Sequence, residues 1–224
     1  MKHHSDRLYN KKAFTLAEVL ITLGIIGIVA AMTMPVLIAK YRSKVLETQF
    51  KKRYSEVSQV FIQLKKNDEY LSITSGSQLQ DFFVKQFKEA KAPVRDIYLA
   101  SPERQKELIG FELPVYKSYD KKSEYYERLL DDGFIFVNNE YFVFINADYG
   151  SFSNASITID VNGLNGPNIA GYDLFTFKLD ENFNLLPRDK NSLLCHKTSS
   201  QQHNGYSCSW YAMNDKDYFK NLGW

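Results

Sequence analysis

The feature that most constrains this chain is an apolar run near the N-terminus. From Val19 to Ala39 there are 21 uncharged and mostly apolar residues. At about 1.5 Å per residue, a helix of this length roughly matches the thickness of a bilayer core. Glu18, directly before the run, is the only charged residue between Phe14 and Ala39. The run therefore predicts a membrane-spanning helix that begins beside a single carboxylate.

Glu18 needs an explanation of its own. A carboxylate at membrane depth costs about 2.5–3.5 kcal/mol on insertion scales, so such a residue usually has a partner. The apolar segment contains no Lys or Arg that could serve. One candidate partner is a new α-amino group, created if the chain were cut just before Phe14. Glu18 is therefore a candidate functional residue.

Charge divides the chain into four sections. Residues 1–13 carry a net charge of +3, residues 40–66 carry +6 and residues 67–224 carry −6, within an overall +2. We expect a leader at 1–13, an apolar helix at 14–39, a basic stem at 40–66 and an acidic head at 67–224. The small net charge excludes a strongly cationic nucleic-acid-binding protein. The 44% hydrophobic content excludes a disordered chain.

A secretory signal peptide is the simplest alternative for the N-terminal segment. Lys11 and Lys12 would form its basic region, and residues 29–31 would offer a cleavage site after the apolar stretch. Three features weigh against it. The apolar run continues past that site, Glu18 lies where such a signal is purely apolar, and no turn signal interrupts the helical pattern.

A more specific resemblance lies in residues 11–21, which read KKAFTLAEVLI. This segment resembles the class III signal of type IV pilins and of type II secretion pseudopilins. That signal has a short basic leader, a small residue, Phe-Thr-Leu, and a Glu five residues into the mature chain. The resemblance extends to Pro35, where the family often has a helix-kinking proline. Ala13 departs from the pattern, because the family most often has Gly there.

The resemblance implies a processing and assembly pathway. A prepilin peptidase would cleave between Ala13 and Phe14 and methylate the new amine of Phe14. Glu18 would then pair with the Phe14 amine of a neighbouring subunit as a filament assembles. The expected partners are the peptidase, other pilin or pseudopilin subunits, the inner-membrane assembly platform and the inner membrane. Nucleic acid is not expected as a partner.

The same resemblance implies a location. The chain would span the bacterial inner membrane once, with its N-terminus in the cytoplasm and its head in the periplasm. It would later enter a filament that reaches the cell surface.

The stem extends the helix beyond the membrane. Residues 36–66 show apolar positions mostly three and four apart, and neither Gly nor Pro follows Pro35 in this range. The apolar positions are Leu46, Phe50, Tyr54, Val57, Phe61 and Leu64. We expect one helix of about fifty residues that is kinked at Pro35.

The head begins with short elements. Leu71–Gly76 is rich in Ser, Thr and Gly and predicts a loop, whereas Gln78–Ala90 has helical composition and spacing. Glu103–Ile109 predicts a short helix, and Tyr125–Leu130 predicts a helical turn.

The hydrophobic period then changes to two. Gly133–Val137 and Tyr141–Asn146 predict a hairpin, and Ala155–Val161 and Tyr172–Leu179 predict two further strands. The pattern predicts an α+β fold, in which a long N-terminal helix packs on a small antiparallel sheet. The resemblance to pilins implies the same architecture.

The segment between the last two predicted strands has two interpretations. Five oxygen-bearing side chains occur in fourteen residues: Asp160, Asn162, Asn165, Asn168 and Asp173. They could wrap a hard cation such as Ca²⁺, with Asp160, Asn162 and Asp173 as the first candidates. The alternative is a structural turn, because Asn, Asp, Gly and Pro are also turn residues. The spacing is not that of an EF-hand. Loops of this kind also resemble loops in minor pilin and pseudopilin heads, some of which bind calcium.

Cys195 and Cys208 are the only cysteines. Composition alone is compatible with one disulfide or with two free thiols. The pilin resemblance implies a head outside the inner membrane and therefore a disulfide, which would close a C-terminal surface loop. His196 and His203 lie in this segment, but their spacing matches no standard zinc pattern.

No catalytic set is recognisable. The sequence contains no Gly-x-Ser-x-Gly, no Gly-rich phosphate loop and no His-Glu-x-x-His. We therefore expect no enzyme and no required cofactor, but a structural subunit. A minor pilin or pseudopilin is favoured because the head of about 158 residues is larger than a simple major pilin needs. The alternative is a membrane-anchored periplasmic binding module that does not polymerise.

Overall fold

The computed structural model describes residues 14–91, 97, 100–125, 129, 133–147 and 155–224. The chain divides into two compact units, Met1–Arg42 and Ser43–Trp224. The first helix, α1 (Leu16–Lys66), contributes residues to both units. Its 51 residues confirm the prediction of one long helix.

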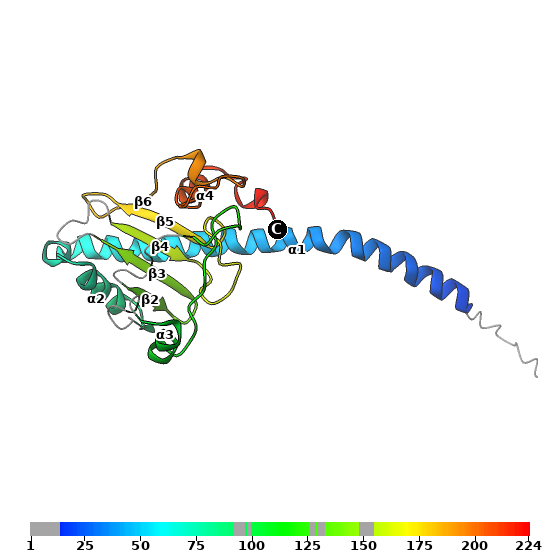
Figure 1. The fold of residues 1–224 in the computed structure, drawn as a ribbon, viewed down its shortest axis with the longest axis horizontal. Helices are drawn as coiled ribbons and strands as arrows, with labels where there is room; N and C mark the ends of the chain where they lie inside the picture. The colour runs from blue at the N-terminus through cyan, green and yellow to red at the C-terminus, as the bar shows by residue number, and fades with distance from the viewer. Residues whose placement is uncertain (1–13, 92–96, 98–99, 126–128, 130–132, 148–154) are drawn as a thin grey trace, which may run out of the picture. The chain divides into compact units, whose positions relative to one another are not determined.

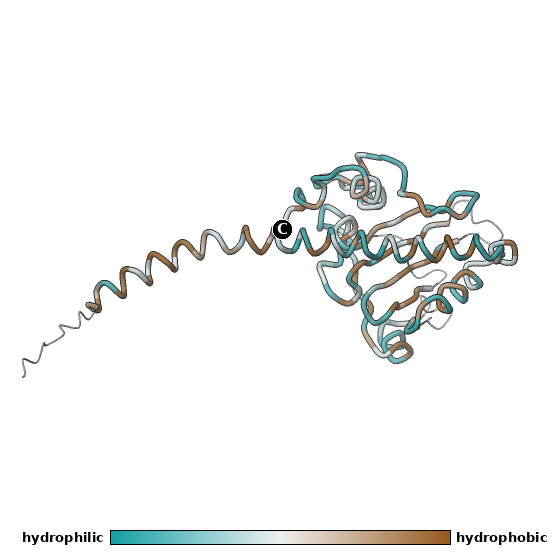
Figure 2. Tube along the Cα trace, turned by 180° about the vertical axis from the view of Figure 1, so that it is seen from behind, coloured by the Kyte–Doolittle hydropathy of each residue, from teal (hydrophilic) through white to brown (hydrophobic). Residues whose placement is uncertain are grey.

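In the first unit, the described residues consist almost entirely of α1 and are mostly exposed apolar side chains. Figure 2 shows this part of the helix largely in the brown of hydrophobic residues. α1 continues through Pro35 as one uninterrupted helix. The kink expected at Pro35 stays a prediction.

The second unit is built on a six-stranded antiparallel sheet in which every strand pairs with its sequence neighbour (Figure 1). The strands are β1 (Ala90–Lys91), β2 (Phe134–Val137), β3 (Tyr141–Asn146), β4 (Ser156–Asp160), β5 (Leu174–Leu179) and β6 (Leu185–Pro187). The sheet and the long helix confirm the predicted α+β, pilin-like architecture.

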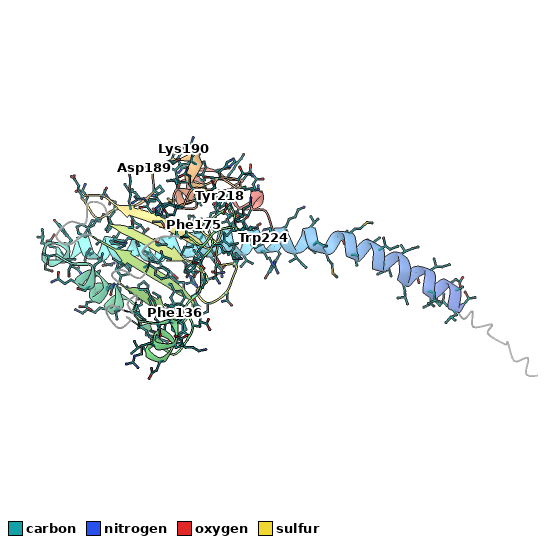
Figure 3. The ribbon with its side chains drawn as sticks, viewed as in Figure 1. Phe136, Phe175, Asp189, Lys190, Tyr218 and Trp224 are labelled. Carbon is teal, nitrogen blue, oxygen red and sulfur yellow. A yellow bond between two sulfur atoms is a disulfide. The ribbon has the colours of Figure 1, made fainter. Side chains whose placement is uncertain are left out.

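Both faces of the sheet are buried. One face packs its branched residues, among them Val143 and Ile159, in a core with Leu46, Phe50 and other residues of α1. The other face carries Phe134, Phe136, Phe142 and Phe144. It packs against apolar residues that follow β1 in the chain, namely Ile97, Ile109, Phe111, Leu113, Tyr116, Tyr125 and Leu129. Phe175 and Phe136, both labelled in Figure 3, belong to the first and second of these cores. Along β2 and β3, the alternation of side chains places Ile135, Val143 and Ile145 on one face and Phe134, Phe142 and Phe144 on the other.

Shorter helices complete the second unit. They are a 3₁₀ helix η1 (Glu69–Ser72), α2 (Gly76–Gln86), α3 (Pro102–Ile109), a 3₁₀ helix η3 (Ser192–Leu194), α4 (Cys208–Asn214) and a 3₁₀ helix η4 (Phe219–Asn221). α2 and α3 confirm the two predicted helices, although α2 ends four residues earlier than expected. The helical turn predicted at Tyr125–Leu130 falls mostly outside the described residues.

The loop prediction for Leu71–Gly76 is wrong at both ends. Leu71 and Ser72 belong to η1, and Gly76 is the first residue of α2. The hydroxyl of Ser75 accepts a hydrogen bond from the Gln78 N–H at 3.3 Å, which caps α2. The Ser and Thr residues that suggested a loop therefore include a helix cap.

The predicted hairpin is present between β2 and β3, with Val137 opposite Tyr141. Asn138 and Asn139 both adopt positive φ, at 51° and 55°. Asn tolerates this left-handed conformation better than most residues do. Local sequence therefore determines this turn.

Arg53 attaches α1 to this hairpin. Its side chain is buried, ion-paired with Glu56 at 2.9 Å and with Glu140 in the turn, and its guanidinium lies 4.4 Å from the ring centre of Tyr141. Close to the other end of the packed part of α1, the indole Nε1 of Trp224 donates to the Ser43 hydroxyl at 2.9 Å (Figure 3). These contacts supplement the apolar packing between α1 and the sheet.

Candidate functional site

The start of α1 is organised by two residues of the predicted processing signal. The backbone N–H and the hydroxyl of Thr15 each donate to the same Glu18 carboxylate oxygen at 2.8 Å. The Glu18 N–H in turn donates to the Thr15 hydroxyl at 3.2 Å. This is a capping box, in which Thr15 caps the helix and the Glu three residues later caps Thr15. The sequence pattern Thr-x-x-Glu before an apolar run is the signal that predicts this cap.

Phe14 is the first described residue and its side chain is 85% exposed. Ala13, the residue expected before the cleavage site, lies outside the described residues. Phe14 is followed by an exposed apolar surface that includes Leu20, Ile26 and Val36. Such a surface is far larger than the isolated apolar residues normal for a soluble protein.

α1 contains a segment that is long and apolar enough to cross a membrane. Its most apolar window of 18 residues has a mean hydropathy of 2.3, and no part of that window is buried in the structure. A buried core helix of a soluble protein would show the opposite. Together with the signal, this helix indicates a membrane-anchored protein.

The second candidate site is the β4–β5 loop, which we define as residues 160–173. The loop is closed by the Val161 N–H, which donates to the Asp173 carbonyl at 2.8 Å. Gly163 and Gly171 have φ values of +64° and +83°. A side chain at Gly171 would lie 2.6 Å from the Cys208 sulfur, so the loop packs directly on the cysteine segment.

Asp160 lies at the start of the loop and is fully buried. One carboxylate oxygen accepts hydrogen bonds from the N–H groups of Asn162 and Gly163, at 3.1 and 2.9 Å. The other accepts from the Tyr116 hydroxyl. Burial raises the pKa of the Asp160 carboxyl well above its usual range, and the nearby Asp173 carboxylate raises it further.

Asp173 lies at the end of the loop and is also fully buried. Its two oxygens accept hydrogen bonds from the N–H groups of Asn168 and Ile169, at 2.7 and 2.8 Å. Burial raises the pKa of Asp173, whereas these hydrogen bonds lower it. The two acids thus hold the loop backbone in place from its two ends.

The three asparagines of the loop differ in their surroundings. Asn162 is 6% exposed, and its Nδ2 donates to the Gly166 carbonyl at 3.0 Å. Its Oδ1 is buried without a hydrogen-bond partner, as is the Oδ1 of Asn168. Asn165 is exposed, and its Nδ2 donates to the Asn162 carbonyl at 3.1 Å. The structure therefore buries Asp160, Asn162 and Asp173, partly buries Asn168 and leaves Asn165 exposed.

No cluster of three or more His, Cys, Asp or Glu side chains occurs among the described residues. Within the part of the chain that the structure describes, a metal site would therefore have to include amide or backbone oxygens. The β4–β5 loop is where buried carboxylates and unpaired amide oxygens occur together.

Cys195 and Cys208 form a disulfide with an S–S distance of 2.04 Å. Inside the loop that they close, the Asn204 side chain accepts from the His196 N–H and donates to the carbonyls of His196 and Ser199. The Tyr119 N–H donates to the Asn204 carbonyl at 2.9 Å. Sequence reasoning missed Asn204 and Tyr116. Tyr116 bonds Asp160, which is 44 residues away in the sequence. Asn204 bonds residues eight and five positions away, but no sequence motif marks this contact.

Comparison with known protein families gives one match. Residues 8–34 match the family model of the prokaryotic N-terminal methylation motif. This motif is the signal of type IV pilin-like proteins and indicates a pilin-like or pseudopilin precursor. Neither the curated proteins nor the solved structures gave a match to the chain.

Proposed function

We propose that this precursor with a prokaryotic N-terminal methylation motif is a structural subunit of a type IV pilus or type II secretion-like filament. The observation that carries the proposal is the combination of the motif at residues 8–34 with the exposed apolar segment of α1. The motif provides for processing, and the apolar segment provides a surface that first anchors the chain and then packs against other subunits.

Within this role, processing takes place at the Ala13–Phe14 bond. A prepilin peptidase removes the leader and methylates the amine of Phe14. The amine then belongs to the residue directly before the Thr15–Glu18 capping box, at the exposed start of the helix. Both groups are thus accessible to a neighbouring subunit.

The assembly role of Glu18 rests on charge. A carboxylate has about four acceptor sites, and one oxygen of Glu18 already accepts two hydrogen bonds from Thr15. The second oxygen has capacity for the Phe14 amine of another copy. This pairing would neutralise both charges in the apolar interior of a filament.

The disulfide supports a periplasmic location for the head. Disulfides form and persist in oxidising compartments and are rare in the cytosol. Basic residues flank the apolar segment on both sides, at 1–13 and at 40–66, so their distribution alone does not set the orientation. The Cys195–Cys208 bond therefore provides the main support for a cytoplasmic N-terminus and a periplasmic head.

We favour a minor pilin or pseudopilin over a major pilin. The head comprises about 158 residues and includes two buried cores, one on each face of the sheet. A major pilin, which repeats along the whole filament, needs a smaller head. A larger head suits a subunit that contacts other components at a defined position.

The first experiment is to determine the intact mass and the N-terminal sequence of the chain from membranes of cells with and without a prepilin peptidase. We expect a start at Phe14 with one methyl group of added mass, and only when the peptidase is present. An intact Met1 in both cells, or a start near Met32, would contradict the proposal.

A second experiment separates the filament subunit from the membrane-anchored binding module. The variant Glu18→Ala should still be cleaved but should fail to enter filaments, as measured by cross-linking and by shearing of surface filaments. Glu47→Ala provides the control, because Glu47 is a carboxylate of the same helix outside the apolar segment. Equal behaviour of the two variants would favour the non-polymerising module.

A further inference from the structure

The head contains three Asn-Gly sequences, which begin at Asn162, Asn165 and Asn204. Asparagine is one of the thermally labile residues, because the backbone nitrogen of the next residue can attack its side-chain amide carbon. This attack closes a five-membered succinimide ring and releases ammonia. A glycine after the asparagine favours the attack, since it has no Cβ to hinder the approach of its nitrogen. The folded chain protects the three sequences to different degrees.

Asn204 is protected at both reacting groups. It is fully buried, and its Oδ1 accepts a hydrogen bond from the His196 N–H at 3.0 Å. Its Nδ2 donates to the carbonyls of His196 and Ser199, at 2.8 and 2.9 Å. The nucleophile is also occupied, because the Gly205 N–H donates to the Leu194 carbonyl at 2.8 Å. Ring closure at Asn204 therefore requires several buried hydrogen bonds to break.

Asn162 is protected in a similar way. It is 6% exposed, and its Nδ2 donates to the Gly166 carbonyl at 3.0 Å. The nucleophile would be the Gly163 nitrogen, whose N–H donates to the buried Asp160 carboxyl group at 2.9 Å. Ring closure here would remove one donor from a buried oxygen atom, which is costly.

Asn165 has neither form of protection. Asn165 and the following Gly166 are both exposed. The Asn165 Nδ2 donates to the Asn162 carbonyl at 3.1 Å, at an exposed position. Within the described part of the chain, the Gly166 N–H donates to no acceptor, and a Cβ added at Gly166 would meet nothing within 4 Å. The attacking nitrogen and the amide carbon can therefore approach each other without disturbing the core.

We propose that Asn165 is a site of spontaneous deamidation in the folded head, whereas Asn162 and Asn204 are protected from it. The Gly166 nitrogen forms a bond to the side-chain carbon of Asn165, and the bond from this carbon to the amide nitrogen breaks. That nitrogen takes the proton of the Gly166 N–H and leaves as ammonia. One water molecule then opens the ring at either carbonyl and yields aspartate or isoaspartate. The sequence of steps needs no oxidant, reductant or enzyme.

The reaction changes both the charge and the contacts of the β4–β5 loop. The amide that donates to the Asn162 carbonyl becomes a carboxylate, which has no proton to donate. Two oxygen atoms then face each other, so this contact is lost. The isoaspartate product also lengthens the backbone of the loop by one methylene group. The inference does not depend on the filament role, since it concerns the second unit alone.

The test uses the full chain in detergent micelles, incubated at mildly alkaline pH in water enriched in heavy oxygen. The heavy oxygen marks product formed during the incubation, and fragment ions in peptide mass spectrometry locate it. We expect Asn165 to react at least about tenfold faster than Asn162 and Asn204, because each protected glycine must first give up a hydrogen bond. The same chain in urea is the control. Unfolding removes the protection, so the three rates should become similar.

Two variants test the mechanism. Gly166→Ala places a Cβ where the structure has room for one, so the variant should fold normally. It should react on the order of tenfold more slowly, because the Cβ hinders the attacking nitrogen. Asn165→Gln keeps an amide but would need a six-membered ring, so this position should stay unmodified. Asn165→Asp has the charge of the product, and the aged native chain should reach its position in isoelectric focusing.

Three results would overturn the inference. The first is a folded chain in which Asn165 is as unreactive as Asn204, although all three sites react in urea. The second is a folded chain in which Asn162 or Asn204 reacts as fast as Asn165. The third is an equal rate at Asn165 in the native chain and in Gly166→Ala, which would exclude ring closure by the Gly166 nitrogen.

Discussion

Thr15 and Glu18 are joined by three hydrogen bonds at the N-terminus of α1, two of which end on a single carboxylate oxygen. The carboxylate that the sequence leaves without a partner therefore has one in its own chain. This relationship separates two roles of Glu18. One is to cap its own helix, which requires only Thr15, and the other is the proposed pairing with the amine of a second copy.

The capping role can be isolated with Thr15→Val, which keeps the shape of the side chain and removes its hydroxyl. We expect the first turn of α1 to lose about 1 kcal/mol of local stability, because two of the three hydrogen bonds use this hydroxyl. Amide hydrogen exchange of the chain in detergent micelles measures the local stability of this turn. Thr33→Val is the matched control, since the Thr33 hydroxyl only donates to the Val29 carbonyl within the helix. Equal exchange rates in the two variants would argue against the cap.

Gly171 and Gly110 provide a second matched pair. Both have φ near +84°, but a Cβ at Gly171 would lie 2.6 Å from the Cys208 sulfur and from the Tyr119 ring, whereas one at Gly110 would meet nothing within 4 Å. We expect Gly171→Ala to lower the free energy of unfolding by about 2–4 kcal/mol and Gly110→Ala by about 1 kcal/mol. Urea unfolding of the chain in detergent micelles measures the free energy of unfolding of the two variants. Equal effects would show that the loop does not pack tightly on the disulfide.

The disulfide should contribute to the stability of the second unit. It closes a loop with a sequence separation of 13, which corresponds to roughly 3 kcal/mol in the chain-entropy model. The double variant Cys195→Ser and Cys208→Ser should lose about this amount of unfolding free energy. Dithiothreitol should destabilise the native chain to the same level and leave the double variant unchanged. A native chain that is insensitive to the reductant would contradict this prediction.

The contact between Arg53 and Glu140 should make the head sensitive to acid. The hydrogen bond and charge of Arg53 lower the pKa of Glu140 in the folded chain. The carboxylate therefore stabilises the fold above its unfolded pKa, and this contribution disappears as the pH falls through the lowered folded value.

Glu140→Gln should reduce the stability at neutral pH and flatten its decline in acid, with a small amplitude because Glu140 is half exposed. Thermal unfolding measured at a series of pH values between about 2 and 7 gives this decline in stability. Glu107→Gln, which alters an exposed pair with Arg104, is the control. A decline in Glu140→Gln as steep as in the native chain would refute the role of this contact.

Local patterns predicted the elements whose residues carry their own signals. The Asn138–Asn139 turn and the helix at residues 16–66 were predicted closely, because turn chemistry and hydrophobic period act over neighbouring residues. β1 and β6 were missed. They have two and three residues and lie at the two edges of the sheet, where pairing depends on the neighbouring strand and not on a pattern of their own.

The sequence by itself determined that the chain has a processing signal, an apolar helix and an acidic head, because these follow from residue type, order and spacing. Only the tertiary structure brings Asp160 and Asp173 together, places Tyr116 on Asp160, and sets Arg53 against Glu140, which is 87 residues away. Such contacts depend on the packing of β4 and β5 and of α1 on the sheet. A buried side chain finds its partner in space, and the spacing of residues along the chain does not specify that partner.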